Sequence, residues 1–461
     1  MTKNLTVGNP ALLILSFAVP LFIGNVFQQF YNMADAFIVG RTIGINALAA
    51  VGSTGSLNFL ILGFLMGFCS GAAILTSQRF GAGDERGIRR SFAATIIISI
   101  GVTAVLMTVS ILTARPLLTL LRTPAEILDD TCRYITIIYW GIPTALLFNL
   151  LANTMRAVGD SRTPLLFLVI ACIINIILDL VFILVLHTGV EGAAYATVIA
   201  QLVSGLLCIP VIIKRIPILN ISKEDWRVET KEIWEHIRLA LPVGFQMSII
   251  AIGTVAVSYA LNKLGTASVA AFTAAAKIDQ TATMVLNSFG AAMTTYSAQN
   301  YGARKIDRIR RGMIQCSFIS CAYSIVMGLV FLFFGRSFSA VFLGRGSDET
   351  LSMSHAYLII NSSCYLLLSM LFIIRQSLQG LGDSVTPTVA GIMELLMRIF
   401  AAIILGNLFG FNGICFASPL AWLGAMIPLT IAIVFTMKRL NRQSLQQRVR
   451  RKSKCRDPEY E

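Results

Sequence analysis

Residues 11–40 read ALLILSFAVPLFIGNVFQQFYNMADAFIVG. A helix of this length rises about 1.5 Å per residue and can cross a hydrocarbon core about 30 Å thick. The stretch nevertheless contains a carboxylate, Asp35, and a proline, Pro20. A charge within hydrocarbon costs at least about 2.5 kcal/mol, so it normally faces a protein interior or a water-filled path. We therefore predict that Asp35 lies on an ion or substrate path, and that Pro20 kinks this helix as a hinge.

The composition identifies a polytopic membrane protein. Of the 461 residues, 56% are hydrophobic and only 13% are charged, and the mean hydropathy is +0.75. Apolar runs and the residues that break them predict an all-α fold with twelve transmembrane helices. The predicted spans lie near residues 11–40, 46–78, 91–113, 131–157, 164–186, 191–213, 233–262, 267–299, 312–334, 352–380, 387–408 and 413–437.

The net charge of +14 is explained by where the basic residues fall. In a soluble chain such a charge would suggest a nucleic-acid partner. With the N-terminus inside, 27 of the 37 Lys and Arg residues lie in cytoplasmic segments and seven in external ones. Because basic residues concentrate on the cytoplasmic side of membrane proteins, we predict a multi-pass plasma-membrane protein with both termini cytoplasmic and no nucleic-acid partner.

An internal duplication organises the chain. SQRFGAGDERGIRR at 77–90 matches AQNYGARKIDRIRR at 298–311 with an offset of 221 residues, and VGDSRTP at 158–164 matches LGDSVTP at 381–387 with an offset of 223. Fixed-offset similarity is the signature of a structural repeat. Six spans per half keep both halves in the same orientation, so the pseudo-twofold axis should follow the membrane normal.

The duplication divides the sequence into four predicted segments. These are an N lobe at 1–213, a cytoplasmic linker at 214–232, a C lobe at 233–437 and a basic cytoplasmic tail at 438–461. The cleft between the lobes is where transporters with repeats commonly place their sites.

The N lobe contains a cluster of oxygen-bearing side chains at similar depth. Asp35 lies five residues before the end of its span, Asp179 eight residues before His187, and Thr197 five residues after Gly192 in the sixth span. Asn175 is one turn from Asp179, so both project from one helix face. Two carboxylates, an amide and a hydroxyl suit a small cation or a shared proton.

The charges within the spans differ between the halves. Asp35 and Asp179 have no deep Lys or Arg in their lobe, whereas the C-lobe acids Asp279 and Glu394 are expected to be matched by Lys277 and Arg398. Arg398 lies at i,i+4 spacing from Glu394, and the partner of Asp279 is either Lys277 or Arg398. We therefore predict that ion coupling resides in the N lobe, and that Asp279 and Glu394 line the cargo pocket or form ion pairs.

These features together resemble a known transporter family. NMADAFIVG near the end of the first span, the paired GDSxTP loops, NIILD in the fifth span and the 6+6 duplication resemble bacterial multidrug and toxic compound extrusion (MATE) proteins of the DinF-like branch. The resemblance implies a V-shaped cavity between two six-helix lobes and export of organic cations coupled to H⁺ or Na⁺. It implies that Asp35, Asn175, Asp179 and Thr197 form the coupling site, with Tyr134 and Asn149 lining the same pocket.

The predicted function is secondary active multidrug efflux by alternating access, carried out by a monomer without a cofactor beyond the coupling ion. A second interpretation keeps the fold but makes the cargo a lipid-linked or other endogenous metabolite. A third, an intramembrane enzyme, is disfavoured because the sequence has no HExxH or GxSxG string, and it has three dispersed histidines and no CxxC pair. We therefore expect neither a catalytic residue nor a bound metal.

Overall fold

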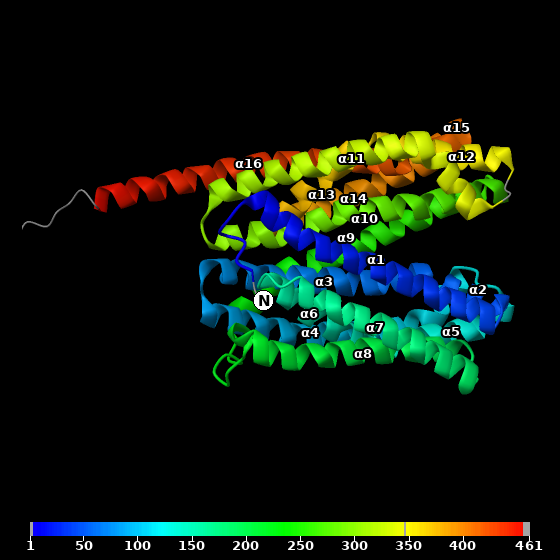
Figure 1. Ribbon diagram of the computed structural model, residues 1–461, viewed down its shortest axis with the longest axis horizontal. Coiled ribbons are helices and arrows are strands. Elements are labelled where there is room, and N and C mark those ends of the chain that lie inside the picture. The colour runs from blue at the N-terminus through cyan, green and yellow to red at the C-terminus, as the bar shows by residue number, and fades with distance from the viewer. Residues whose placement is uncertain (1–2, 345–346, 455–461) are drawn as a thin grey trace, which may run out of the picture.

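The computed structural model describes residues 3–344 and 347–454, and this part of the chain consists of helices joined by turns and short loops (Figure 1). Two of the helices continue into short π-helical segments, η1 and η3, and a 3-10 turn, η2, lies in the linker. The elements are α1 (Pro10–Thr42), α2 (Ile45–Ser53), α3 (Gly55–Ala82), α4 (Glu85–Leu120), α5 (Ala125–Trp140), α6 (Ile142–Ala157), α7 (Arg162–Leu180), η1 (Val181–Val185), α8 (Val190–Arg215), η2 (Pro217–Leu219), α9 (Thr230–Asn262), α10 (Thr266–Gly302), α11 (Ile306–Leu343), α12 (Asp348–Ser363), α13 (Tyr365–Gly380), α14 (Val385–Phe400), η3 (Ala401–Leu405), α15 (Gly406–Cys415) and α16 (Ala417–Lys454).

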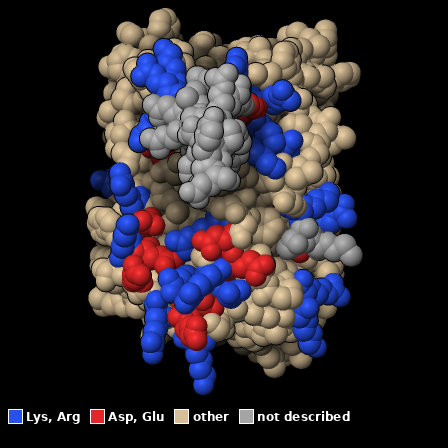
Figure 2. Space-filling model, turned by 90° about the vertical axis from the view of Figure 1, so that its left-hand side faces the viewer, with Lys and Arg blue, Asp and Glu red and all other residues tan. Residues whose placement is uncertain are grey.

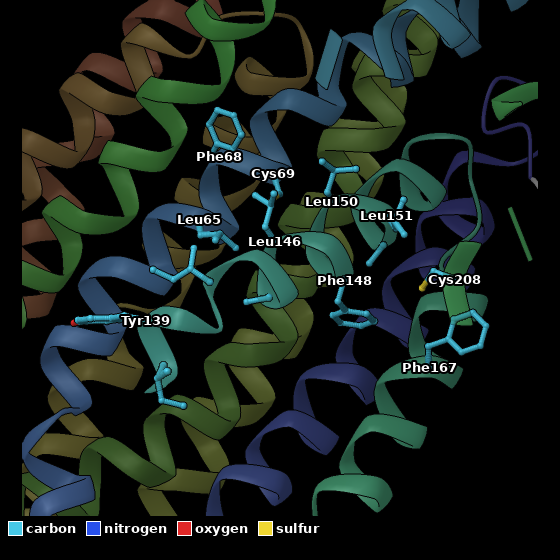
Figure 3. Packing of buried hydrophobic residues seen from close by; sticks show 14 of the residues in the cluster. Leu65, Phe68, Cys69, Tyr139, Leu146, Phe148, Leu150, Leu151, Phe167 and Cys208 are labelled. Atoms are coloured by element: carbon cyan, nitrogen blue, oxygen red, sulfur yellow. The ribbon is translucent and has the colours of Figure 1, made fainter. Parts of the chain in front are cut away.

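The helices form two bundles side by side. Helices α1 to α8 belong to the N lobe and α9 to α16 to the C lobe, with α1 running along the junction (Figure 1). Each lobe has its own hydrophobic core. The N-lobe core includes Phe68, Tyr139 and Phe148 (Figure 3), and the C-lobe core includes Phe331 and Tyr365. The predicted all-α, two-lobe fold is confirmed.

The described helices account for the twelve predicted spans. Nine are long and apolar enough to cross a membrane on their own, and two more spans are bent pairs, α5 with α6 at 45° and α12 with α13 at 50°. The remaining span, α10, is as long as the others but too polar to pass the same test. It carries Lys277 and Asp279, and its C-terminal part from Ser288 to Asn300 is almost entirely buried against other helices. Protein contacts replace lipid contacts there.

The duplication is visible in the irregularities of the helices. Both lobes contain one bent pair, and both contain a π-helical segment at the same place in the repeat, η1 in the N lobe and η3 in the C lobe. The two GDSxTP loops also match. Gly159 and Gly382 have φ angles of +88° and +93°, and the side chains of Asp160 and Asp383 each accept the backbone N–H three residues on over 3.0 Å. These loops therefore end one helix and cap the next.

The two lobes meet through a reciprocal contact, which we call the seam. A Cβ atom at Gly81 would lie 1.9 Å from the backbone oxygen of Gln299, and one at Gly302 would lie 1.7 Å from that of Gln78. The offset of 221 residues exchanges these two pairs. A pseudo-twofold axis therefore passes between α3 and α10, and only glycine permits the two backbones to approach so closely.

Hydrogen bonds between the lobes are confined, among the described residues, to one half of the molecule. We call the end that carries the linker and the start of α1 the terminal end, and the opposite one the distal end (Figure 1). At the seam, Gln299 donates to the Ala157 carbonyl and Gln78 to the Gly380 carbonyl, each over 2.9 Å. Among the hydrogen bonds that α9 makes to the N lobe, the one nearest the distal end is donated by the Ser248 hydroxyl. Among the described residues, the hydrogen bonds between the lobes thus lie between the terminal end and mid-length.

The linker and the tail differ slightly from the predicted boundaries. The linker between α8 and α9 contains Asp225, whose carboxylate forms an ion pair with Arg89 of α4 at 3.1 Å and accepts two hydrogen bonds from Ser222. The linker is therefore docked on the N lobe. The predicted tail begins within α16, which continues as a helix to Lys454, and its residues 455–461 lie outside the described part of the chain.

Candidate functional site

A cavity of about 430 Å³, lined by both polar and apolar residues, lies within the N lobe, and we call it the N-lobe cavity. Four of the predicted site residues line it, each from a different helix: Asp35 from α1, Tyr134 from α5, Asn149 from α6 and Thr197 from α8. The predicted convergence of these side chains is therefore seen in the structure. Its walls also carry further amides and hydroxyls, so the cavity can solvate a polar ligand.

The other two predicted residues lie behind the cavity wall on α7. Asn175 and Asp179 are fully buried. With its amide oriented so that the nitrogen faces Asp179, Asn175 donates to Asp179 Oδ2 over 3.1 Å and accepts the Thr197 backbone N–H over 3.3 Å. The Tyr31 hydroxyl in turn donates to Thr197 Oγ1 over 2.9 Å. A continuous polar chain thus connects Asp179 to the cavity.

The acids of this cluster are not neutralised. Asp35 and Asp179 are close enough to interact electrostatically, and among the described residues neither forms an ion pair. The Oδ1 atom of each is buried without a hydrogen-bond partner. Buried polar atoms are nearly always paired, and a lone buried charge is strongly unfavourable. The site is therefore suited to receiving a cation.

The backbone next to Asp179 is irregular. The π-helical segment η1 begins at Val181, two residues after Asp179. Such segments occur often at functional sites because they reposition neighbouring side chains. In the C lobe the residue two positions before the matching segment η3 is Ile399, so the irregularity belongs to the repeat while an acid at this position belongs to the N lobe alone.

In the C lobe, the predicted match between Asp279 and Lys277 is wrong. Asp279 accepts a hydrogen bond from the Tyr365 hydroxyl, and Lys277 is exposed. Two residues along an α-helix correspond to about 200° of rotation, so the two side chains leave α10 on opposite faces. Asp279 faces α13, whereas Lys277 lines a separate pocket.

The predicted pair of Glu394 with Arg398 is also wrong. Glu394 forms its ion pair with Arg375, which comes from α13, and both side chains are buried. Arg398 lies against α9, where its side chain would contact a Cβ atom at Gly253. The i,i+4 spacing would have allowed an ion pair within one helix, but Glu394 pairs with Arg375 of the facing helix instead. This acid therefore connects α14 to α13 within the C lobe and does not line the N-lobe cavity.

Comparison with known proteins places this arrangement in a family. The MatE family model matches residues 20–181 and 242–404, one match in each lobe. The chain belongs to the MatE family. Its members are transporters, so this protein is a membrane transporter and not an enzyme.

Individual relatives match over most of their length. The probable multidrug resistance protein YoeA of Bacillus subtilis is 28% identical over 386 residues, which are 82% of this chain and 83% of that protein. An FAD transporter of Shewanella oneidensis is 22% identical over 417 residues, 88% of this chain and 90% of that protein. A solved outward-facing structure of a multidrug resistance MATE family transporter is 22% identical, covers 96% of this chain and 99% of its own, and has a TM-score of 0.87.

Sequence reasoning missed Tyr31 of this MatE protein. Its hydroxyl connects α1 to α8 through Thr197, and its ring lines the N-lobe cavity. The spacing to Asp35 is four residues, so both lie on one face of α1, and this signal was present in the sequence. Further polar residues of the cavity wall that were not predicted are Gln28, Asn32, Asn58 and Gln201.

Pro20 is buried inside α1, closer to the terminal end than the N-lobe cavity. Its ring removes one backbone donor from the helix, which lowers the cost of bending there. The helix nevertheless continues to Thr42 as one element. A hinge at Pro20 stays a prediction for this MatE transporter.

Proposed function

We propose that this MatE transporter exports cationic amphiphiles across the plasma membrane, as a monomer, by antiport with H⁺ or Na⁺. The observation that carries the proposal is the pair of buried carboxylates without ion-pair partners among the described residues, of which Asp35 lines the N-lobe cavity and Asp179 lies behind its wall. The name of the Bacillus relative, a probable multidrug resistance protein, supports multidrug cargo.

Antiport follows from the free-energy cost of leaving these two buried carboxylates without a bound cation. An unpaired buried carboxylate is unstable, so a proton or a metal cation that binds there is held tightly. A cationic cargo that approaches Asp35 competes for the same negative charge. Binding of the ion and binding of the cargo thus oppose each other, which is the thermodynamic requirement for exchange.

The main alternative keeps the transporter and changes its cargo. A relative is an FAD transporter, which supports an endogenous metabolite as the exported molecule. Export of a lipid-linked sugar is a variant of the same idea. The acidic N-lobe cavity favours cationic cargo, because complementary charge determines which ligands are accepted.

The test is ethidium efflux from cells that express the protein, with H⁺ and Na⁺ gradients imposed separately. We expect efflux when one of the two gradients is imposed and none when both are collapsed. Efflux that persists without either gradient would contradict antiport. Loss of FAD or lipid precursors from the same cells, without ethidium efflux, would favour the alternative cargo.

We propose that the terminal end faces the cytoplasm. Figure 2 shows the face at this end, where Lys and Arg side chains gather around a patch of Asp and Glu. The excess of basic residues in the loops of this end follows the positive-inside rule. With this orientation, the distal half of the molecule, which lacks hydrogen bonds between the lobes among the described residues, faces outward.

Reporter fusions test this orientation. Reporters fused after Gly83, Lys223 or Lys452 are expected to read cytoplasmic, and those after Gly189 or Gly410 external. The first three positions lie in terminal-end segments, whereas Gly189 precedes α8 at the distal end and Gly410 lies at the kink of α15. Alkaline phosphatase and green fluorescent protein fusions would measure this. An external position for Lys223 would invalidate both the number of spans and the orientation.

A further inference from the structure

A small pocket of about 90 Å³ lies between the lobes beside the seam, and we call it the axial pocket. Its walls come from α1, α3 and α6 of the N lobe and from α10 and α13 of the C lobe. Ala157, whose carbonyl accepts the seam hydrogen bond from Gln299, lines it. Ser77 also lines it and lies four residues, or about 6 Å, from Gly81 of the seam. The axial pocket therefore lies where hydrogen bonds join the two lobes.

The axial pocket lies on the pseudo-twofold axis. Many of its lining residues are related by the repeat offsets of 221 and 223 residues: Ser70 with Ala291, Ala73 with Thr294, Ile74 with Thr295, Ser77 with Ala298, and Asn153 with Gln376. Arg156 breaks this symmetry, because its counterpart Gln379 donates to Gln246 over 2.8 Å and does not line the pocket. The N lobe alone thus supplies a cation to a pocket that both lobes enclose.

No acid of the pocket neutralises Arg156. In the part of the chain that the structure describes, Arg156 forms no ion pair, and its Nε atom is buried without a hydrogen-bond partner. The described residues that line the axial pocket include neither Asp nor Glu. Because a buried charge without a partner is strongly unfavourable, this arginine calls for a negative charge from outside the chain.

Neutral side chains of the axial pocket add further hydrogen-bond donors. Gln376 accepts the Thr294 hydroxyl through Oε1 over 2.6 Å, which leaves its two amide N–H groups for another acceptor. Asn153 donates one N–H to the Asn149 carbonyl over 2.8 Å and retains a second. A guanidinium and amide donors without a carboxylate suit an anion, since hydrogen bonds to an ionised acceptor are stronger than neutral ones.

The size of the axial pocket restricts the anion to a small one. Sites for drug-sized ligands have volumes of about 300 Å³ or more. A volume of about 90 Å³ accommodates chloride or a small oxyanion but no amphiphile. The axial pocket is therefore distinct from any cargo site.

We propose that the axial pocket binds a small inorganic anion, such as chloride, which pairs with Arg156 of the N lobe and accepts hydrogen bonds from Gln376 of the C lobe. The bound anion contacts both lobes, so it stabilises the state in which the terminal end is closed by the seam. Separation of the lobes at this end would remove the contacts from one of them and release the anion. This inference does not depend on which cargo the transporter exports.

The experiment measures the thermal unfolding midpoint of the purified protein as sodium gluconate is replaced stepwise by sodium chloride, nitrate or phosphate at constant Na⁺. A ligand that binds the folded state raises this midpoint as its concentration increases. We expect a saturable rise with chloride, because gluconate is too large for the axial pocket. A rise with phosphate and not with chloride would identify the anion as an oxyanion. No saturable rise with any of these salts would overturn the inference.

Arg156→Gln gives the N lobe the residue that the C lobe has at the equivalent position. We expect it to increase the chloride concentration for half of the response at least about tenfold, as loss of a charged donor does. Arg156→Lys retains a cation and should retain the response. Arg86→Gln, which removes an exposed arginine at the terminal end of the same lobe, is the matched control and should change nothing. An unchanged chloride response in Arg156→Gln would contradict the proposed site.

Gln376→Glu places the negative charge within the protein. Its Oε1 atom can still accept the Thr294 hydroxyl, and its carboxylate can pair with Arg156 from the opposite lobe. We expect a higher unfolding midpoint in gluconate than for the parent protein, and no further rise with chloride. This variant decides the question even if Arg156→Gln fails to fold. A full chloride response in Gln376→Glu would show that the anion binds elsewhere.

Discussion

Asp179→Asn is expected to abolish gradient-driven efflux of ethidium, to the background of cells without the protein, while leaving the transporter folded and inserted. Asparagine has the same shape, and its side-chain oxygen can still accept the hydrogen bond from Asn175 that Asp179 Oδ2 accepts. It has no negative charge, so it cannot bind and release a proton or a metal cation. Efflux per molecule, with abundance measured by immunoblot, reports the effect.

Asp35→Asn is expected to have the same effect, because both acids contribute to one negative site. Asp129→Asn is the matched control. Asp129 is an exposed acid of the same lobe that pairs with Arg115 at 3.2 Å, so its loss should leave efflux unchanged. Parental pumping by Asp179→Asn would show that the coupling site is not in the N lobe.

The helices could be predicted from the sequence because lipid imposes a simple requirement on them. Long apolar runs, separated by glycine, proline and charged residues, mark the spans. For α10 this signal is weaker, because the helix is more polar and much of its C-terminal part is covered by protein. The apolar pattern still predicted a span at 267–299, and the repeat agrees with it, because the segment ending at Gly302 matches the one ending at Gly81. The seam built from these two glycines is the structural consequence of that match.

The N-lobe site could be predicted because depth and helix face are properties of single helices. Asp35, Asp179 and Thr197 lie at similar depth, and the structure brings their helices around one polar cluster. Ion pairs between side chains of different helices could not be predicted this way. Glu394 has Arg398 one turn away, yet pairs with Arg375 of α13, because only the packing of α13 against α14 decides which arginine reaches it.

The ion pair of Glu394 with Arg375 yields the second large expected effect. Glu394→Gln leaves the Arg375 guanidinium buried without its carboxylate, and Arg375 Nε already lacks a partner. Breaking a buried pair by removing one member costs about 3–5 kcal/mol. We therefore expect a large drop in the thermal unfolding midpoint of the purified protein, measured by fluorescence-detected size exclusion. The abundance of the protein in cells should also fall, which reduces efflux of all cargoes alike.

The double variant Glu394→Met with Arg375→Met tests whether the cost comes from the unpaired charge. Two apolar side chains of similar volume remove both buried charges, and such replacements are often neutral or stabilising, so the unfolding midpoint should recover. The surviving molecules should still require an ion gradient for efflux, since the N-lobe acids are intact. A double variant as unstable as Glu394→Gln would show that the two side chains act through packing. Loss of the gradient requirement in the double variant would show that coupling is shared by both lobes, which would contradict its assignment to Asp35 and Asp179.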